Sequence, residues 1–277
     1  EAATEEALLA HFSERSFPVF QEFDAAPHNV DVVAVAERFT EERRWRSFNI
    51  SLADNADPWA YRPELTSDAD NDDWYYLHTH LFLDDLCNAY EQNGRRRYLE
   101  AGRDLLLDWI RRHPVPTDTN GGTGLIWGAL SPRTRTLTWV RTHQIFLDAG
   151  VLDAAQHATF IAALWETAHL LDHYPFRGFN FALFRETALL LLTVVLPEFE
   201  SMRRLQDKVL GKIQEELELE LYPDGFQKEL STVYHTVVVR VAEVLAHAKK
   251  TGQKIQVPFA AELERAFEVW LNLSRPD

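Results

Sequence analysis

The chain turns from one helical segment into the next at residues 223–235, which read Pro223-Asp224-Gly225-Phe226-Gln227-Lys228-Glu229-Leu230-Ser231-Thr232-Val233-Tyr234-His235. The Pro-Asp-Gly sequence is typical of a turn, and Ser231 stands directly before an apolar helical pattern, where an N-cap residue is expected. The first turn of that helix then carries Tyr234 next to His235. On residue types alone, a core tyrosine with a satisfied hydroxyl is slightly favoured over a proton-donating tyrosine in a site.

Helical periodicity continues on both sides of this stretch, and strand signals are few. The expected helices cover 4–12, 30–45, 72–93, 95–112, 133–149, 153–173, 180–196, 198–221, 231–251 and 258–273. Loops are expected at 49–70 and, rich in glycine, at 114–132. Gly94, Gly150 and Gly252 stand where helices should end. The sequence therefore predicts an all-α fold.

From residue 72 on, the expected helices form four successive pairs, whose first members start near Asp72, Arg133, Asn180 and Ser231. Helical pairs that repeat without a tight consensus can stack into an open solenoid or close into an α/α toroid. In a toroid, the starts of the first helices lie on one rim. We therefore expect Asn180, Tyr234 and the Gly-rich loop before Arg133 to line one cleft.

Composition excludes several classes of function. The chain has 277 residues, 46% of them hydrophobic, which is enough for a large core and for one or two domains. Its formal net charge of −15 does not suit a binder of duplex nucleic acid, so we expect no nucleic-acid partner. No apolar run is long enough to span a membrane. Cys87 is the only cysteine, which excludes an intrachain disulfide and a cysteine-rich metal site.

Two further groups carry side chains that suit an anionic ligand. Asn180 starts an apolar helix, where it serves either as an N-cap or as a neutral amide that grips a substrate carboxylate. Arg133 and Arg135 follow Trp127 and the Gly-rich loop at a helix start, and arginine suits bidentate recognition of carboxylate or sulfate. Solvated surface arginines are an equally good interpretation of this pair.

Histidine and carboxylate pairs give weaker signals. His78 and His80 are spaced i, i+2, which points them in different directions on a helix, so a zinc site is not expected and at most one of them faces a cleft. Asp84 and Asp85 are candidate catalytic carboxylates, although most acidic pairs on helices are solvated. Glu229, two residues before the expected N-cap, either orients a group in a site or only favours the helix start.

Residues 223–235 resemble a segment of the heparinase II/III-like family of polysaccharide lyases, Pro-Asp-Gly…Glu-x-Ser-x-x-Tyr-His. The helix led by Asn180, the segment 127–135 and the helix from 74 to 90 are also similar to that family, so the resemblance covers the chain from about residue 70. It implies an incomplete α/α toroid of antiparallel helical hairpins at 71–277 and an N-terminal helical and loop segment at 1–70 that packs on it. It also implies a C-terminal antiparallel β-sandwich that is absent from this sequence.

The reaction of that family is β-elimination on a uronic-acid-containing polysaccharide. A base removes the proton next to the carboxylate, and an acid protonates the leaving glycosidic oxygen. The resemblance assigns Asn180 to neutralising the carboxylate, Tyr234 to the acid, with the base as a second role open to it, and His235 to the wall of the site. It implies substrate-binding roles for Arg135, Arg133, Trp127, Glu229 and His80.

The resemblance further implies an anionic polysaccharide as partner, no cofactor, no metal, and a periplasmic or secreted location. Some relatives carry a histidine directly after the leading asparagine, and Phe181 at that place favours a heparinase III-like subtype over an alginate-lyase subtype. Family members also draw a catalytic histidine from the β-sandwich, so we expect the isolated chain to lack part of its site.

Two other functions stay open on the residues alone. A glycoside hydrolase or unsaturated-uronide hydrolase on a similar toroid needs carboxylates placed across the scissile bond, and Asp84, Asp85 or Glu229 would have to serve. A non-catalytic helical module would bind glycan or protein without turning it over.

Overall fold

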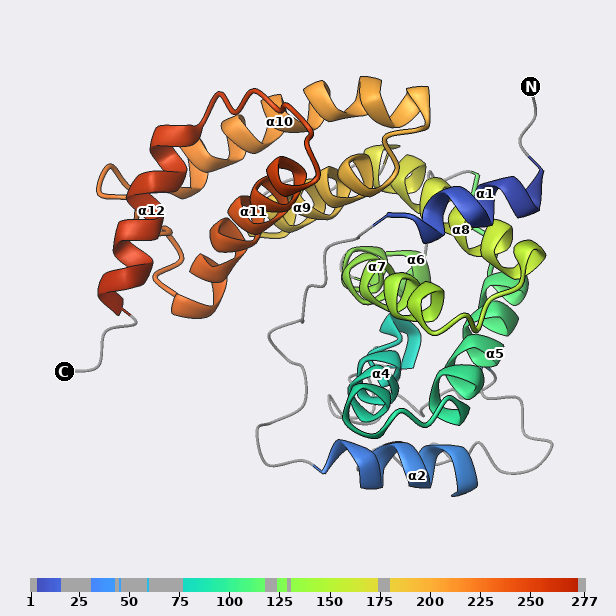
Figure 1. Ribbon diagram of the computed structural model, residues 1–277. Coiled ribbons are helices and arrows are strands. Elements are labelled where there is room, and N and C mark those ends of the chain that lie inside the picture. The colour runs from blue at the N-terminus through green and yellow to red at the C-terminus, as the bar shows by residue number, and fades with distance from the viewer. Residues whose placement is uncertain are drawn as a thin grey trace. The chain divides into compact units, whose positions relative to one another are not determined.

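The computed structural model describes residues 4–15, 31–42, 45, 59, 77–117, 124–128, 131–173 and 180–273. The regular elements in these residues are helices (Figure 1). In chain order they are α1 (Glu5–Ser13), α2 (Val32–Glu42), α4 (Phe82–Asn93), α5 (Arg97–Arg112), α6 (Gly124–Trp127), α7 (Ser131–Asp148), α8 (Ala154–His173), α9 (Asn180–Val195), α10 (Glu200–Glu220), α11 (Thr232–Lys250) and α12 (Ala260–Leu273). The all-α prediction is confirmed for this part of the chain. None of these helices is long and apolar enough to cross a membrane.

Two compact units make up the chain, residues 1–167 and residues 168–277. The predicted domain boundary near residue 70 lies outside the described residues and stays a prediction. Most of the predicted loop at 49–70 also lies outside the described residues, with Trp59 as the exception. The same holds for Gly121 and Gly122 of the second predicted loop.

Most helix ends lie within a few residues of the predicted ones, because the predicted end signals form. Gly94, Gly150 and Gly252 follow α4, α7 and α11 with φ values of 71°, 62° and 80°. Asp153 caps α8, since its Oδ1 accepts a hydrogen bond from the backbone N–H of Gln156 at 2.8 Å. The Gln156 side chain accepts one in return from the N–H of Asp153 at 3.0 Å, which completes a capping box.

One predicted helix is interrupted. A continuous helix over 72–93 is wrong for the described residues, since the helical turn at residues 77–79 ends at His80 and α4 starts at Phe82. His80 has a φ of 63°, which is uncommon for a residue other than glycine. Its imidazole is held from α7, because Nδ1 accepts a hydrogen bond from Trp139 Nε1 at 2.9 Å. A tertiary contact thus overrides the local helical pattern.

In the first unit, α7 lies in the core and contacts α4, which also packs against α2 and α5. Every residue of α7 from Ser131 to Leu147 is buried. A helix that is buried on all sides ordinarily carries apolar residues, whereas α7 carries three arginines, several threonines and a histidine. Its polar side chains must therefore find partners inside the core.

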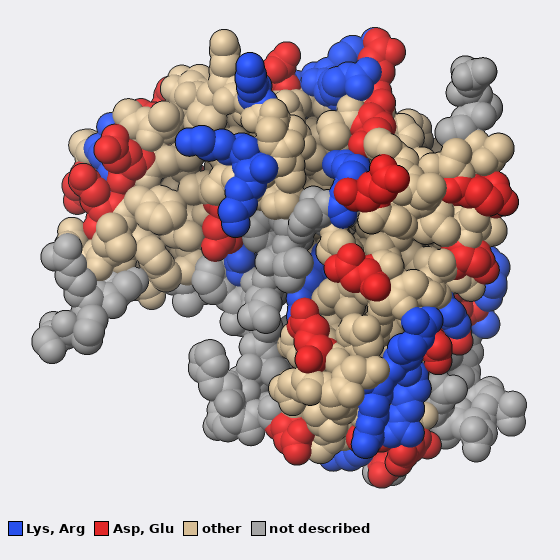
Figure 2. Space-filling model, viewed as in Figure 1, with Lys and Arg blue, Asp and Glu red and all other residues tan. Residues whose placement is uncertain are grey.

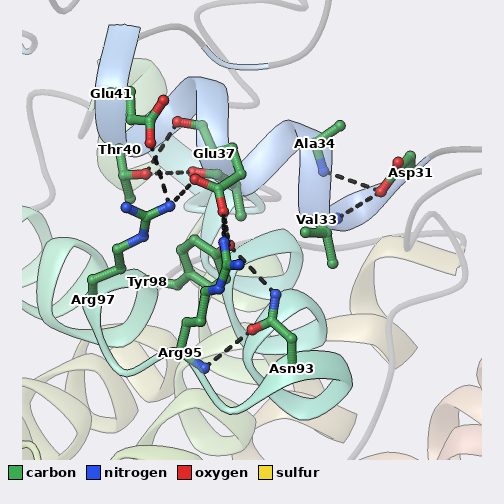
Figure 3. A network of polar contacts seen from close by, with 11 residues as sticks. Asp31, Val33, Ala34, Glu37, Thr40, Glu41, Asn93, Arg95, Arg97 and Tyr98 are labelled. Atoms are coloured by element: carbon green, nitrogen blue, oxygen red, sulfur yellow. Dashed lines mark hydrogen bonds and ion pairs between the residues drawn. The ribbon is translucent and has the colours of Figure 1, made fainter.

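α2 is held on the α4–α5 hairpin through one carboxylate. Glu37 on α2 accepts hydrogen bonds from Arg95 and Arg97 and, at 2.5 Å, from the hydroxyl of Tyr98 (Figure 3). Arg97 also pairs with Glu41 at 3.3 Å. Figure 2 shows basic side chains gathered over the turn between α4 and α5, with acidic side chains beside them. Arg95 and Arg97 are therefore neutralised within the unit.

The second unit is built around α9, which packs against α10 and α11, while α11 packs against α12 (Figure 1). The centre of α9 contributes a run of fully buried apolar side chains from Ala188 to Leu192. Burial of this run supplies much of the driving force for the unit's folding. Residues 221–231 connect α10 to α11 and contain the Pro-Asp-Gly turn.

Candidate functional site

The connection between α10 and α11 folds back on itself as a tight hairpin-like turn. Leu221 and Gln227 form an isolated antiparallel bridge, and the backbone N–H of Tyr222 donates to the carbonyl of Phe226 at 2.8 Å. Asp224 Oδ1 accepts a hydrogen bond from the N–H of Phe226 at 3.0 Å, as expected of an aspartate in a turn. The predicted turn is confirmed.

Gly225 lets this turn approach α12 closely. Its φ is 91°, in the left-handed region that favours glycine. A Cβ atom at this position would lie 2.6 Å from the carbonyl carbon of Arg265 and 2.9 Å from the nitrogen of Ala266. The backbone of α12 therefore packs directly on the turn, in a space that only glycine leaves open.

Glu229 joins the end of the connection to the start of α9. Its Oε1 accepts a hydrogen bond from the backbone N–H of Asn180 at 3.0 Å, and its Oε2 accepts one from Asn180 Nδ2 at 3.0 Å. The carboxylate thus lies at the N-terminus of α9, where the helix dipole favours a negative charge. The structure brings together two predicted site residues that are 49 positions apart in the sequence.

The side chain of Asn180 does not act as an N-cap, so that interpretation is wrong. Asn180 is the first residue of α9 and is only 4% exposed. Within the described residues its Oδ1 has no hydrogen-bond partner. A buried carbonyl oxygen without a partner is costly, and such groups call for an explanation such as a ligand.

Tyr234 lies in the first turn of α11, which Ser231 caps as predicted. The Ser231 Oγ accepts a hydrogen bond from the backbone N–H of Tyr234 at 3.4 Å. The Tyr234 residue is 38% exposed, so the interpretation of a core tyrosine is wrong. Leu230, just before the cap, has a φ of 56° and is 69% exposed. Strained backbone of this kind is frequent at functional sites.

His235 points into the core instead. It is fully buried, and its Nε2 lies 2.8 Å from the carbonyl oxygen of Ala266 on α12. Because a carbonyl oxygen only accepts, Nε2 carries the proton. The imidazole also stacks on Phe226 and Trp270, with ring centroids 5.5 and 6.3 Å away. Its role as a site-lining histidine stays a prediction, and the contacts that the structure gives it are packing contacts within the second unit.

The predicted substrate-binding residues Arg133, Arg135, Trp127 and His80 belong to the first unit, and all four are buried. Solvated surface arginines are therefore a wrong interpretation of Arg133 and Arg135. Arg135 Nη1 donates a hydrogen bond to the backbone carbonyl of His78 at 2.7 Å. Their roles in substrate binding stay predictions.

Three tryptophans surround the guanidinium of Arg135. Its central carbon lies 4.5 Å from the ring centres of Trp109 and Trp127 and 5.9 Å from that of Trp139. Cation–π contacts of this kind stabilise a cation that has lost its water. The same tryptophans hold the histidines, because Trp109 Nε1 donates to His78 Nδ1 at 3.0 Å and Trp139 Nε1 donates to His80 Nδ1.

Burial, followed by the charge of Arg135, lowers the pKa of His80 well below its usual value. The imidazole of His80 is therefore neutral and accepts the tryptophan hydrogen bond. Among the described residues, no three or more His, Cys, Asp and Glu side chains are grouped so that they could hold a metal ion.

The acidic pair on α4 is buried, so the expectation of solvated carboxylates is wrong. Asp84 pairs with Arg141 at 2.9 Å and accepts a hydrogen bond from Thr138 at 3.2 Å. Asp85 accepts one from Trp45 Nε1 at 2.8 Å. Both carboxylates are occupied by partners in the core, which does not suit the pair of catalytic acids that a hydrolase needs.

Gln227 also contributes to the candidate site, because it bonds Glu229, and the sequence did not predict this role. It is buried, its Oε1 accepts a hydrogen bond from the N–H of Glu229 at 2.8 Å, and its Nε2 donates to Glu229 Oε1 at 3.3 Å and to Glu220 Oε2 at 3.2 Å. Its place two residues before Glu229 was the available signal, but an amide in a turn has no distinctive pattern.

Comparison with known proteins places this arrangement in a family. The model of the heparinase II/III N-terminus matches residues 2–277, which is nearly the whole chain. This chain belongs to the heparinase II/III N-terminus family. The predicted resemblance is therefore confirmed.

Among curated relatives of this heparinase II/III N-terminal chain are two heparin-sulfate lyases. One, from Bacteroides thetaiotaomicron, is 26% identical over 223 residues, which cover 79% of this chain and 31% of the relative. The other, from Pedobacter heparinus, is 22% identical over 288 residues, which cover 98% of this chain and 42% of the relative. The chain thus spans less than half the length of these relatives.

Solved structures agree with the fold. A heparan sulfate lyase mutant from Pedobacter heparinus matches with a TM-score of 0.79 at 19% identity, over 99% of this chain and 44% of that one. The crystal structure of a heparinase III matches with a TM-score of 0.76 at 24% identity, over 96% of this chain and 42% of that one. The predicted fold, an incomplete α/α toroid of antiparallel helical hairpins, is confirmed by this likeness.

Proposed function

We propose that this chain is the helical part of a polysaccharide lyase that cleaves a uronic-acid-containing polysaccharide by β-elimination. The observation that carries the proposal is the pairing of a buried amide and an exposed phenol at one connection. Asn180 is fixed by Glu229, and Tyr234 lies on the first turn of the helix that follows Glu229. The names of the curated relatives, both heparin-sulfate lyases, support the reaction class and make heparan sulfate the first polymer to test.

The chain between Glu229 and Tyr234 is short, which supports a shared site for Asn180 and Tyr234. From Glu229 to Ser231 the chain spans at most about 7 Å, and the helical turn from Ser231 to Tyr234 rises only about 5 Å. The Cα atom of Tyr234 therefore lies within about 12 Å of that of Glu229, which itself contacts Asn180. We propose that one uronic acid residue contacts both side chains.

In the proposed reaction, the Asn180 amide hydrogen-bonds the uronate carboxylate and stabilises the charge that develops on it when the neighbouring C–H proton is removed. The electron pair of that C–H bond forms the new C=C bond, and the C–O bond to the leaving sugar breaks. Tyr234 donates its proton to the leaving oxygen. A base must take the first proton: either a histidine of a β-sandwich domain takes it, or the phenolate form of Tyr234 takes it and then passes that same proton to the leaving oxygen.

The test uses the full-length protein and a panel of heparan sulfate, hyaluronan, alginate and glucuronan. We expect wild-type protein to release an ultraviolet-absorbing unsaturated uronide from at least one of them. Tyr234→Phe should remove most of this activity, because the variant lacks the donated proton. Tyr222→Phe is the matched control, since Tyr222 is also exposed in the same connection and should leave the rate unchanged.

Each contrary outcome has a distinct meaning. New reducing ends without an unsaturated product would identify a hydrolase. Binding of a polymer without any product would identify a non-catalytic module. Full activity in Tyr234→Phe would remove Tyr234 from the reaction and leave the lyase assignment to the other residues.

A further inference from the structure

The two oxygen atoms of Glu229 are already used inside the protein. One accepts from the backbone of Asn180 and from Gln227 Nε2, and the other accepts from Asn180 Nδ2. Of the roughly four acceptor sites of a carboxylate, three are thus occupied, and at most one, on Oε2, is left for a substrate. The substrate-binding role that the sequence resemblance implies for Glu229 stays a prediction, and the contacts favour a role inside the protein.

We infer that Glu229 is a positioning residue, which holds the amide of Asn180 in one orientation for the proposed reaction. A carboxylate accepts hydrogen bonds and, when ionised, donates none. The group that faces Glu229 must therefore be Nδ2, which turns Oδ1 of Asn180 to the other side. The second N–H of Nδ2 and the carbonyl oxygen Oδ1, which has no partner among the described residues, then remain for a ligand. This inference rests on the proposed function.

The position of Glu229 is itself fixed by hydrogen bonds to Gln227. Gln227 is buried and bonds both the backbone N–H and the Oε1 of Glu229, while its Nε2 also reaches Glu220. Burial, and next the nearby charge of Glu229, raises the pKa of Glu220. Side-chain hydrogen bonds thus link the end of α10 to the start of α9, through Glu220, Gln227, Glu229 and Asn180 in that order. Such supporting contacts hold a reacting group in a productive geometry.

The geometry makes Glu229→Gln an informative variant, because it keeps the size of the side chain and changes only its hydrogen bonding. The new amide offers one acceptor where the carboxylate offered two. The backbone N–H of Asn180 is fixed by α9 and keeps that acceptor. Nδ2 then faces an N–H₂ group, so the Asn180 amide leaves its orientation.

In the full-length protein we expect Glu229→Gln to lower kcat by about 10- to 100-fold with a smaller change in KM, as is usual when a reacting group is misplaced. Glu264→Gln, the same change at an exposed glutamate on α12, should leave both constants unchanged. Melting curves of the two variants show whether the loss has a purely structural origin.

A double-mutant cycle separates positioning from direct substrate binding. If Glu229 acts through Asn180, Glu229→Gln adds no further loss to Asn180→Ala. If Glu229 binds substrate by itself, the two losses multiply, and the inference is overturned.

A spectroscopic measurement decides the inference even if the lyase proposal fails. The side-chain amide signals of Asn180, identified by their absence in Asn180→Ala, should shift strongly in Glu229→Gln and stay in place in Glu264→Gln. An unsaturated product from no polymer, together with this shift, would reject the proposed reaction and keep the positioning role. Unchanged amide signals in Glu229→Gln would overturn the positioning role whatever the reaction.

Discussion

Arg141 on α7 and Asp84 on α4 form an ion pair in the core of the first unit, with Nη1 2.9 Å from Oδ1. Burial raises the pKa of Asp84, and the charge and hydrogen bond of Arg141 offset part of that rise. The other nitrogen of Arg141, Nη2, donates to Asn88 at 2.6 Å and to Glu91 at 2.8 Å. The guanidinium is thus anchored along one face of α4.

Replacing Asp84 by Asn should lower the free energy of unfolding by about 3 kcal/mol, because it leaves a buried cation with an incomplete set of partners. Urea denaturation measures the loss. Glu91→Gln removes the other carboxylate, whose side chain is 48% exposed, and should cost about 1 kcal/mol or less. Equal losses in the two variants would contradict the central place given to the Asp84 pair.

A second prediction concerns acid. His143 and His157 stack in the first unit with ring centroids 5.1 Å apart. Burial lowers the pKa of His157 to about 4, and burial and the neighbouring His157 lower that of His143 well below its usual value. Between pH of about 6.5 and about 4 the unfolded chain therefore binds more protons than the folded one, so the free energy of unfolding should fall as the pH falls.

Thermal unfolding at a series of pH values between about 7 and about 5 checks this dependence. His157→Gln should flatten it, because one of the titrating groups is gone. His173→Gln, at the exposed end of α8, should retain the wild-type slope. A slope in His157→Gln equal to that of the wild type would show that other groups cause the acid sensitivity.

Gly225 offers a third test. Gly225→Ala puts a Cβ atom 2.6 Å from the Arg265 carbonyl carbon and strains the backbone at a φ of 91°. We expect a loss of about 2 kcal/mol or more in the free energy of unfolding. Gly211→Ala on α10 meets nothing within 4 Å and should be neutral or stabilising by up to about 1 kcal/mol, because alanine favours helix. Similar effects of both changes would argue against the close approach of α12.

The fourth prediction concerns the cage that Trp109, Trp127 and Trp139 form around the guanidinium of Arg135. Arg135→Lys keeps the charge but loses the planar group that stacks on Trp109 and Trp127, and should cost about 2 kcal/mol. Arg111→Lys, at a side chain that is 73% exposed, should change the free energy of unfolding by less than about 0.5 kcal/mol. A neutral result at Arg135 would mean that the cage does not depend on the guanidinium.

The sequence predicted the helices well because their ends depend on local chemistry. Gly94 and Ser231 act within one turn of the helices they end or begin, so their residue types suffice. The polar helix α7 shows the opposite case. In sequence, a solvated Arg135 is an equally good interpretation, and only the partners that other helices bring, such as Trp109, explain its burial.

In the candidate site, too, local sequence predicted some features and not others. The motif in residues 223–235 was visible, and the turn and the cap follow from it. Residue types alone slightly favoured a core Tyr234, which the structure exposes. The direction of His235 was not visible, because it depends on Ala266 on α12, 31 positions later. The bond from Glu229 to Asn180 crosses 49 positions and has no local sequence signal.

The contacts of α12 also bear on the order in which the chain matures during synthesis. A ribosome releases the turn at Gly225 and the imidazole of His235 before it releases Arg265 and Ala266, which close over them. Until then, the surface of the nascent turn and the Nε2 atom of His235 stay open to water. The residues that carry the proposed chemistry are therefore translated before the helix that locks their neighbours, and a stalled or clipped chain without α12 would present the motif but not its geometry.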